Sequence, residues 1–316
     1  MLSRIFASIS RIELMAYSYQ VEWYCALNHF QKLDDVASKS LINLEIDLKI
    51  YNLLMGREVN FRVSDLSSIY NYPHPEVYIR RTVEPGDDLV LRKIDNDNPI
   101  LNLAVHNLLP FSRILFDTLG DRLLYVHMVR HPLYMIKQQA LNFERYIGTE
   151  KSCKDFTVYA GLEDSVIPYY ALEWSKDYMS SNSYEKSIFF ISNYYKKIRG
   201  LEETLPLQTV SFEAFVKNPD PFINKICDLL KISDRGEELT EELRRQNLPR
   251  QCYSDGQALQ IYKDCGWQHL GVNDFFGEKD VLLKEFGPLL SEECRSILSE
   301  IVDWYESEFL GDIELR

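Results

Sequence analysis

The chain has 316 residues, of which 46% are hydrophobic and 26% are charged, and its formal net charge is −13. This composition is typical of a globular protein, and so acidic a chain lacks the clustered Lys and Arg of a broad nucleic-acid surface. The charge leaves room for a small cationic pocket that binds one anion. No apolar stretch approaches the ~20 residues that span a bilayer, so we expect no membrane segment.

We expect a single domain over residues 1–316, because no Pro/Gly/Ser-rich linker and no internal repeat interrupts the sequence. Residues 235–285 are polar and aromatic and predict a loop-rich cap. None of the six cysteines forms a C-x-x-C pair. This spacing predicts reduced thiols and no metal site, with a disulfide between Cys252 and Cys265 only if the protein is secretory.

The first predicted element is an amphipathic helix within residues 1–14. Its apolar residues follow helical spacing at Leu2, Ile5, Phe6, Ile9 and Ile12. No capping residue precedes this helix, which is the pattern of a helix whose beginning is missing from the sequence. We expect that a strand and a loop of the complete fold precede Met1.

Three short apolar runs bounded by turn residues predict buried strands, at residues 88–94, 122–129 and 207–212. Helical spacing predicts helices at residues 100–119, 133–146, 184–205, 221–231 and 291–309, the last with Ser291 as N-cap. Strands that alternate with helices in this way predict an α/β fold, with a parallel sheet flanked by helices.

The second predicted strand ends in Arg130-His131-Pro132, and Pro132 suits the first turn of the next helix. Ligands of open α/β sheets bind beyond the carboxyl ends of strands, where a helix N-terminus attracts anions. A guanidinium at this point offers a phosphate a bidentate fork. The alternative is a surface arginine paired with an acidic neighbour, and the local pattern does not decide between the two.

The segment HMVRHPLYMIKQQALNF resembles the 3'-phosphate-binding segment of the PAPS-dependent sulfotransferases, in which Arg-x-Pro follows a strand. Arg130 and Pro132 match that pattern. The residue eight positions after the arginine is Gln138, where the family carries Ser, although a Gln amide can also donate to phosphate. Residues 209–232 resemble a later, mainly structural block of the family, in which Glu213 is a turn or capping residue.

The resemblance implies a P-loop nucleotide-hydrolase-like fold and transfer of a sulfuryl group from PAPS, the co-substrate, to a hydroxyl or amine. Arg130 would hold the 3'-phosphate, and Gln138 and His131 would lie beside it. Arg250 would belong to a loop that covers the nucleotide, with Arg244 and Arg245 as alternatives.

Two further residues are candidates for catalysis. VLRKIDNDNPILNLAVHNLLPF resembles the stretch where many members carry a lysine, which makes Lys93 the carried-over candidate. His106 follows this stretch and is the best candidate for the general base. No metal is implied.

The family's Gly/Ser/Thr-rich loop for the 5'-phosphosulfate is missing from the sequence, and we expect it before Met1. The chain is then either part of a longer enzyme or a relative that no longer transfers sulfate. The alternative function is a non-catalytic nucleotide-binding or scaffold protein of the same fold. A nucleotide kinase is disfavoured, because the sequence has no G-x-x-x-x-G-K-[ST] motif.

The expected partner is a small-molecule or carbohydrate acceptor, with no nucleic acid and no membrane segment. Tyrosines 169, 170, 178 and 184 around Trp174 suit a polyhydroxyl acceptor, but such residues also pack ordinary interfaces. We expect a cytoplasmic protein, or one of the Golgi lumen if an upstream membrane anchor is missing.

Overall fold

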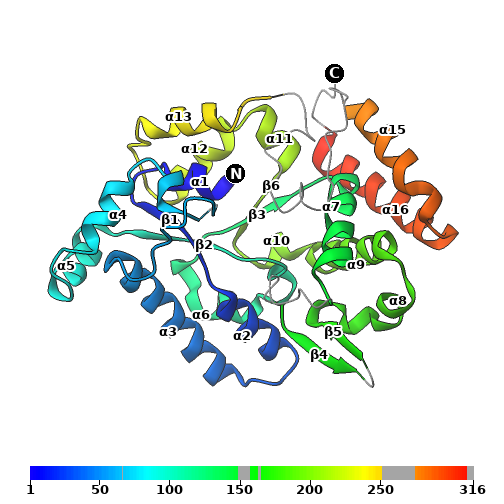
Figure 1. Ribbon diagram of the computed structural model, residues 1–316, viewed down its shortest axis with the longest axis horizontal. Coiled ribbons are helices and arrows are strands. Elements are labelled where there is room, and N and C mark those ends of the chain that lie inside the picture. The colour runs from blue at the N-terminus through cyan, green and yellow to red at the C-terminus, as the bar shows by residue number, and fades with distance from the viewer. Residues whose placement is uncertain (66, 149–156, 163–164, 251–274, 312–316) are drawn as a thin grey trace. The chain divides into compact units, whose positions relative to one another are not determined.

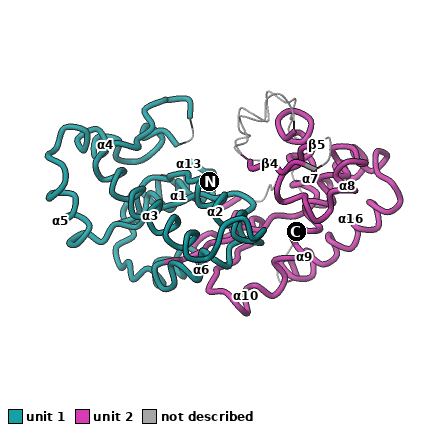
Figure 2. The backbone as a smooth tube through the Cα atoms, turned by 90° about the horizontal axis from the view of Figure 1, so that it is seen from below, with its two compact units in different colours: residues 1–122, 223–248 teal, residues 123–222, 249–316 magenta. Residues whose placement is uncertain are grey.

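The computed structural model describes residues 1–65, 67–148, 157–162, 165–250 and 275–311 (Figure 1). The chain divides into two compact units. Unit 1 comprises Met1–Arg122 and Ile223–Leu248, and unit 2 comprises Leu123–Phe222 and Pro249–Arg316 (Figure 2). The fold is α/β, mainly helical, with short parallel strand pairs.

Unit 1 is built around β1 (Ile12–Tyr17) and β2 (Ile100–Ala104), which pair in parallel. Its described helices are α1 (Leu2–Ala7), α2 (Tyr19–His29), α3 (Asp35–Leu54), η1 (Ile69–Asn71), α4 (Pro75–Arg81), α5 (Asp88–Asp97), η2 (Leu109–Phe111), α6 (Arg113–Leu119), η3 (Gly120–Arg122), α13 (Glu238–Arg245) and the part of α12 (Asp220–Leu229) that follows Phe222.

The core of unit 1 forms around β1, whose first four residues are all buried, as expected for a parallel strand covered on both faces. Leu14 and Met15 pack with residues of α3, η1 and α4. Two tyrosine hydroxyls accept backbone hydrogen bonds from this strand: Tyr78 from Leu14 (3.0 Å) and Tyr72 from Met15 (3.2 Å). These tyrosines therefore satisfy strand N–H groups that would otherwise be buried without partners.

Unit 2 is built around β3 (Tyr125–Val129) and β6 (Leu207–Ser211), which also pair in parallel (Figure 1). The strands β4 (Tyr159–Leu162) and β5 (Ser165–Pro168) form an antiparallel hairpin. The described helices are α7 (Pro132–Arg145), η5 (Tyr169–Trp174), α8 (Ser175–Ser180), α9 (Ser183–Ile198), α10 (Leu201–Thr204), α11 (Phe212–Lys217), α15 (Phe275–Phe286), η6 (Gly287–Leu289), α16 (Glu292–Tyr305), the π-helical turn η7 (Glu306–Leu310) and the start of α12.

Helices α7, α9 and α16 pack together in unit 2 and bury a continuous apolar face. Tyr195 of α9 lies in this core, almost fully buried, and its hydroxyl donates to the backbone carbonyl of Arg130 (2.6 Å). This bond fixes the backbone at the point where β3 gives way to α7. The predicted strands at 122–129 and 207–212 are confirmed, as are the helix at 133–146 and the N-cap Ser291, which accepts from the Cys294 N–H.

The prediction of one helix over residues 1–14 is wrong beyond Ala7. The chain turns at Arg11, which has φ +68°, and Ile12 begins β1. Apolar residues at 9 and 12 fitted the helical period, but they belong to the turn and the strand. β1 and α2 form a strand followed by a helix after α1.

The predicted strand at 88–94 is also wrong, because these residues begin α5, and the predicted helix at 100–119 begins with β2. Periodicity alone does not separate short apolar runs into strands and helices. Pro110 lies where it would interrupt a helix over the whole range, and the regular helix α6 begins only at Arg113. In residues 235–285, α13 and α15 are helical and residues 251–274 lie outside the described part.

We expect unit 2 to lose stability in mild acid because of His127. Its ring lies within β3, buried, with Nε2 3.0 Å from the Tyr194 hydroxyl oxygen. Burial lowers the pKa of His127 from 6.5 to about 4. The unfolded chain therefore takes up the proton first as pH falls, so stability is full above pH 6.5 and declines through the window down to about 4.

The loss across this window should be on the order of 3 kcal/mol, measured by chemical denaturation followed through tryptophan fluorescence. His127→Gln should flatten the pH dependence. His74→Gln is the matched control, because ion pairs with Glu238 and Glu76 raise the pKa of His74 and so give its effect the opposite sign. Equal pH profiles for wild type and His127→Gln would refute the assignment.

Candidate functional site

The Arg-His-Pro turn lies at the carboxyl edge of the β3–β6 pair. Val129 and Ser211 are register partners and end the two strands, so Arg130 and Phe212 follow side by side. The Arg130 Cζ lies 4.6 Å from the centre of the Phe212 ring and 5.3 Å from that of Tyr134. The guanidinium is thus held by two aromatic rings at the N-terminal end of α7, where the helix dipole favours an anion.

Arg250 approaches the same aromatic ring. Its Cζ lies 5.8 Å from the centre of Phe212, and its backbone N–H donates to the Val216 carbonyl (2.8 Å). Both arginines are partly exposed. The structure therefore brings together Arg130 and Arg250, two of the residues predicted to bind the nucleotide, on one ring at the strand ends.

His131 is placed differently from its neighbour. Its ring is fully buried, Nδ1 accepts the Leu133 N–H (3.4 Å) and caps α7, and Nε2 lies 3.1 Å from Glu306 Oε1. Both ring nitrogens contact other residues of the fold, and the buried ring has no exposed surface that a ligand could contact. We therefore assign His131 a structural role and not the predicted contact with the nucleotide.

A buried carboxylate stabilises the Arg-His-Pro turn. Glu213, in the first turn of α11 as the sequence predicted, accepts hydrogen bonds from the His131 N–H (3.1 Å) and the Tyr305 hydroxyl (2.5 Å). Its side chain is fully buried. Burial and the charge of Glu213 raise the pKa of Tyr305, so the hydroxyl remains a donor at neutral pH. Gln138, the remaining predicted ligand, is half-buried near the middle of α7.

In unit 1, His106 follows β2 and lies beside the end of β1. Its ring is nearly parallel to those of Tyr17 and Tyr19, with centres 5.8 and 6.2 Å away. Nδ1 lies 3.3 Å from Glu22 Oε1, and the side chain is 54% exposed. A carboxylate beside Nδ1 favours the proton on that nitrogen and leaves Nε2 as the basic one. This arrangement suits a general base.

The turn between β1 and α2 has no glycine or lysine in the sequence Tyr17-Ser18-Tyr19-Gln20. Ser18 accepts from the Val21 N–H and caps α2, and its hydroxyl donates to Glu45 (2.6 Å). Tyrosines and carboxylates thus surround this turn, and its four residues include no cation. Ser18, directly before α2, is a residue type typical of an N-cap and was the signal in the sequence that could have located this turn.

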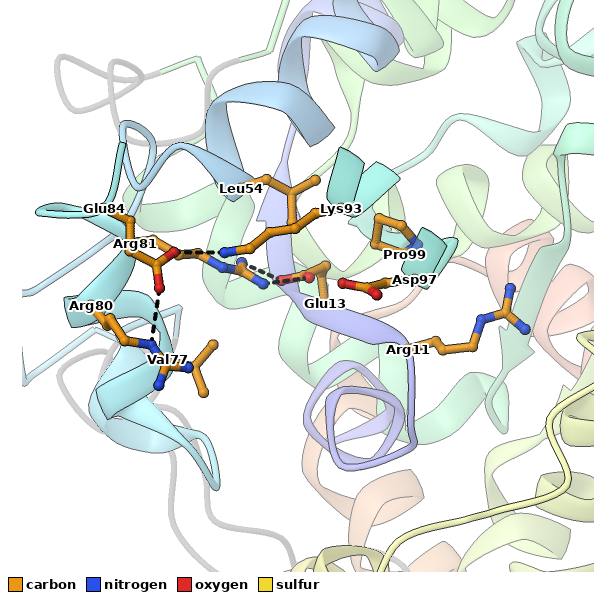
Figure 3. A pocket seen from close by; sticks show the side chains of 10 residues that line it. All are labelled: Arg11, Glu13, Leu54, Val77, Arg80, Arg81, Glu84, Lys93, Asp97 and Pro99. Carbon is orange, nitrogen blue, oxygen red and sulfur yellow. Dashed lines mark hydrogen bonds and ion pairs between the residues drawn. The ribbon is translucent and has the colours of Figure 1, made fainter. Parts of the chain in front are cut away.

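Lys93 does not join His106. It lies on α5 and lines a cavity of about 310 Å³ that opens near Arg11 and Pro99, the residues just before β1 and β2 (Figure 3). His106 follows the other end of β2, a strand of five residues, about 16 Å long at the usual rise. The two predicted catalytic residues therefore lie at opposite ends of one strand.

The remaining predictions concern side chains away from these sites. Arg244 and Arg245 pair with Glu241 on the exposed surface of α13. Tyr169, Tyr170, Tyr178 and Trp174 are buried and pack edge to face, so they form core and not a surface for an acceptor.

The cysteines that the structure describes, Cys25, Cys227 and Cys294, are buried free thiols, and burial raises the pKa of Cys25 to about 12. The other three, Cys153, Cys252 and Cys265, lie outside the described residues, as does the possible disulfide. The described residues contain no group of three or more His, Cys, Asp or Glu placed to hold a metal ion. Within the same ranges, no helix has the length and apolar character that crossing a membrane requires.

Comparisons of the chain with protein-family models, with characterised protein sequences and with solved structures gave no match.

We expect Glu213→Gln to loosen the Arg-His-Pro turn. The amide keeps one acceptor oxygen but turns an NH₂ group toward one of the two donors that now meet the carboxylate. Leaving a buried donor unsatisfied costs roughly 2 kcal/mol, to be measured by chemical denaturation. Glu173→Gln, which alters a half-exposed ion pair with Lys197, should change stability by less than about 0.5 kcal/mol. Equal effects of the two substitutions would contradict the role given to Glu213.

Proposed function

We propose that this chain is a sulfotransferase-type protein that binds 3'-phosphoadenosine 5'-phosphosulfate, with Arg130 as the anchor of the 3'-phosphate. The observation that carries the proposal is the Arg130 guanidinium, held on Phe212 at the carboxyl end of paired parallel strands and followed at once by the Pro-led helix α7. Ligands of α/β sheets bind at this edge, and a phosphate matches both the fork of Arg and the helix terminus.

Arg250 supports the same assignment, because it brings a second guanidinium to Phe212 from a different part of the chain. A phosphate near this ring would accept N–H groups from both guanidiniums. The P-loop-like arrangement of strands that the resemblance implies is part of this proposal.

His106 is proposed as the general base for the transfer, within its own unit. Its Nε2 would take the proton from the acceptor hydroxyl. Glu22, beside Nδ1, would orient the ring and stabilise the imidazolium. Lys93 has no part in this proposal, because it lies at the opposite end of β2.

A second candidate, a nucleotide-binding protein without transferase activity, is favoured by the turn between β1 and α2. The residues of this turn offer a 5'-phosphosulfate no cation and no glycine-lined nest of N–H groups. Such a protein would hold the nucleotide through Arg130 and leave the sulfuryl group without stabilisation. The two candidates share the binding site and differ in turnover.

We expect adenosine 3',5'-bisphosphate to bind more tightly than adenosine 5'-monophosphate, which lacks the 3'-phosphate, when both are measured by calorimetry. Arg130→Ala should weaken the bisphosphate roughly 10- to 100-fold and remove the preference, since a charge-assisted pair is lost. Arg130→Lys should give an intermediate affinity, because lysine keeps the charge and lacks the fork.

Arg199→Ala is the matched control. Arg199 is also stacked on an aromatic ring, with its Cζ 4.5 Å from the centre of Trp304, but it ends α9 and not a strand. Its replacement should leave both affinities unchanged. If Arg130→Ala keeps the preference for the bisphosphate, the proposed phosphate anchor is refuted.

We expect His106→Ala to lower sulfate transfer by at least about 100-fold while the affinity for adenosine 3',5'-bisphosphate stays the same, because general base catalysis contributes at that level. The measurement is release of the bisphosphate from PAPS with a panel of hydroxyl and amine acceptors. His74→Ala, an exposed histidine paired with Glu76 and Glu238, is the control and should transfer normally. Unchanged sulfate transfer by His106→Ala would rule out His106 as the general base. If the wild type binds the nucleotide but transfers no sulfate, the non-catalytic candidate is favoured.

A further inference from the structure

A cavity of about 310 Å³ lies within unit 1, at the amino ends of β1 and β2, and takes no part in the proposed function (Figure 3). Its described lining comes from α3, α4, α5, β1, the turn between α4 and α5 and the turns that precede the two strands. It consists of Arg11, Glu13, Leu54, Val77, Arg80, Arg81, Glu84, Lys93, Asp97 and Pro99. A cavity of this volume has room for about ten water molecules, and so for an organic ligand of about ten heavy atoms.

One side of the cavity is fixed by a bidentate ion pair. Arg81 donates to both carboxylate oxygens of Glu13, at 2.7 and 2.8 Å, and the Tyr78 hydroxyl donates to the same carboxylate (3.1 Å). The side chains of Arg81 and Glu13 are only 10% and 9% exposed. The two opposite charges of this nearly buried pair cancel, so it shapes the cavity without adding a net charge.

Apart from this pair, the lining carries three cations, Arg11, Arg80 and Lys93, and two carboxylates, Glu84 and Asp97. Glu84 pairs with Lys93 (2.6 Å) and with Arg80 (3.2 Å), so one carboxylate serves two cations (Figure 3). The hydrogen bond from Lys93 lowers the pKa of Glu84, which is therefore ionised at neutral pH.

Arg11 adds a further cation, whose guanidinium donates to the backbone carbonyls of Asn98 (3.1 Å) and Leu230 (3.4 Å). In all, four cations and three carboxylates line the described cavity, an excess of one positive charge in a chain whose net charge is −13.

We propose that this cavity binds a small organic monocarboxylate, whose carboxylate joins Lys93 and Arg80 and whose apolar body packs against Leu54, Val77 and Pro99. One negative charge restores the balance, and the three apolar side chains give the hydrocarbon part a surface that a bare inorganic anion cannot use. Glu84 now occupies the place of the ligand carboxylate and competes with it. It is borne on the turn between α4 and α5, outside both helices.

The test uses benzoate as the probe, with benzamide as its neutral counterpart and sulfate as an anion without an apolar body, titrated into the full chain by ligand-observed NMR. Benzoate should bind saturably, and benzamide and sulfate at least about tenfold more weakly, because each lacks one of the two contacts. Glu84→Gln should tighten benzoate about tenfold by removing the competitor, and Lys93→Gln should weaken it about tenfold.

Glu58→Gln is the control, since Glu58 pairs with Lys49 (2.6 Å) in the same unit and does not line the cavity. It should leave benzoate binding unchanged, and circular dichroism of each variant checks that the chain is folded. Absence of saturable benzoate binding to both the wild type and folded Glu84→Gln overturns the proposal, as does equal binding of benzamide. Neither result bears on the nucleotide site, whose test uses a different ligand and different residues.

Discussion

The parallel register of β3 and β6 is the constraint on which the proposed nucleotide site depends. Because Val129 pairs with Ser211, the residues that follow the two strands emerge together, and the Arg130 guanidinium meets the Phe212 ring. A register shifted by one residue would turn every side chain of the strand to the other face. The bonds from Tyr195 to the Arg130 carbonyl and from His131 to Glu213 hold the same junction from the helix side.

The sequence predicted this junction well because its signals are local. A short apolar run before Arg130, and a proline that suits the first helical position, together specify a strand, a turn and a helix without any distant contact. The capping residue Ser291 was equally readable, since an N-cap acts on an N–H three residues away. The structural role of His131 was not readable, because Glu306, its partner, lies 175 positions along the chain.

The first hundred residues were predicted less well, for two physical reasons. The apolar runs at 9–17 and 88–104 are short enough to fit either period, and what decides between strand and helix is the tertiary packing around β1 and β2. The cavity depends on pairs such as Arg81 with Glu13, 68 positions apart, for which no spacing rule exists. The sequence therefore indicates Lys93 as a candidate functional residue, but it does not reveal the partner of Lys93 or the residues around it.

The two groups of cations differ in the contacts that orient them. A bidentate carboxylate, as on Arg81, uses the N–H groups that an anion would need. An aromatic ring, as beneath Arg130 and Arg250, contacts the flat face of the guanidinium, and the N–H groups lie in its plane. Packing an arginine on an aromatic ring is thus a way to orient the plane of its guanidinium. Arg80 and Lys93 are an intermediate case. They share the carboxylate of Glu84, which holds each cation less firmly than a dedicated partner does.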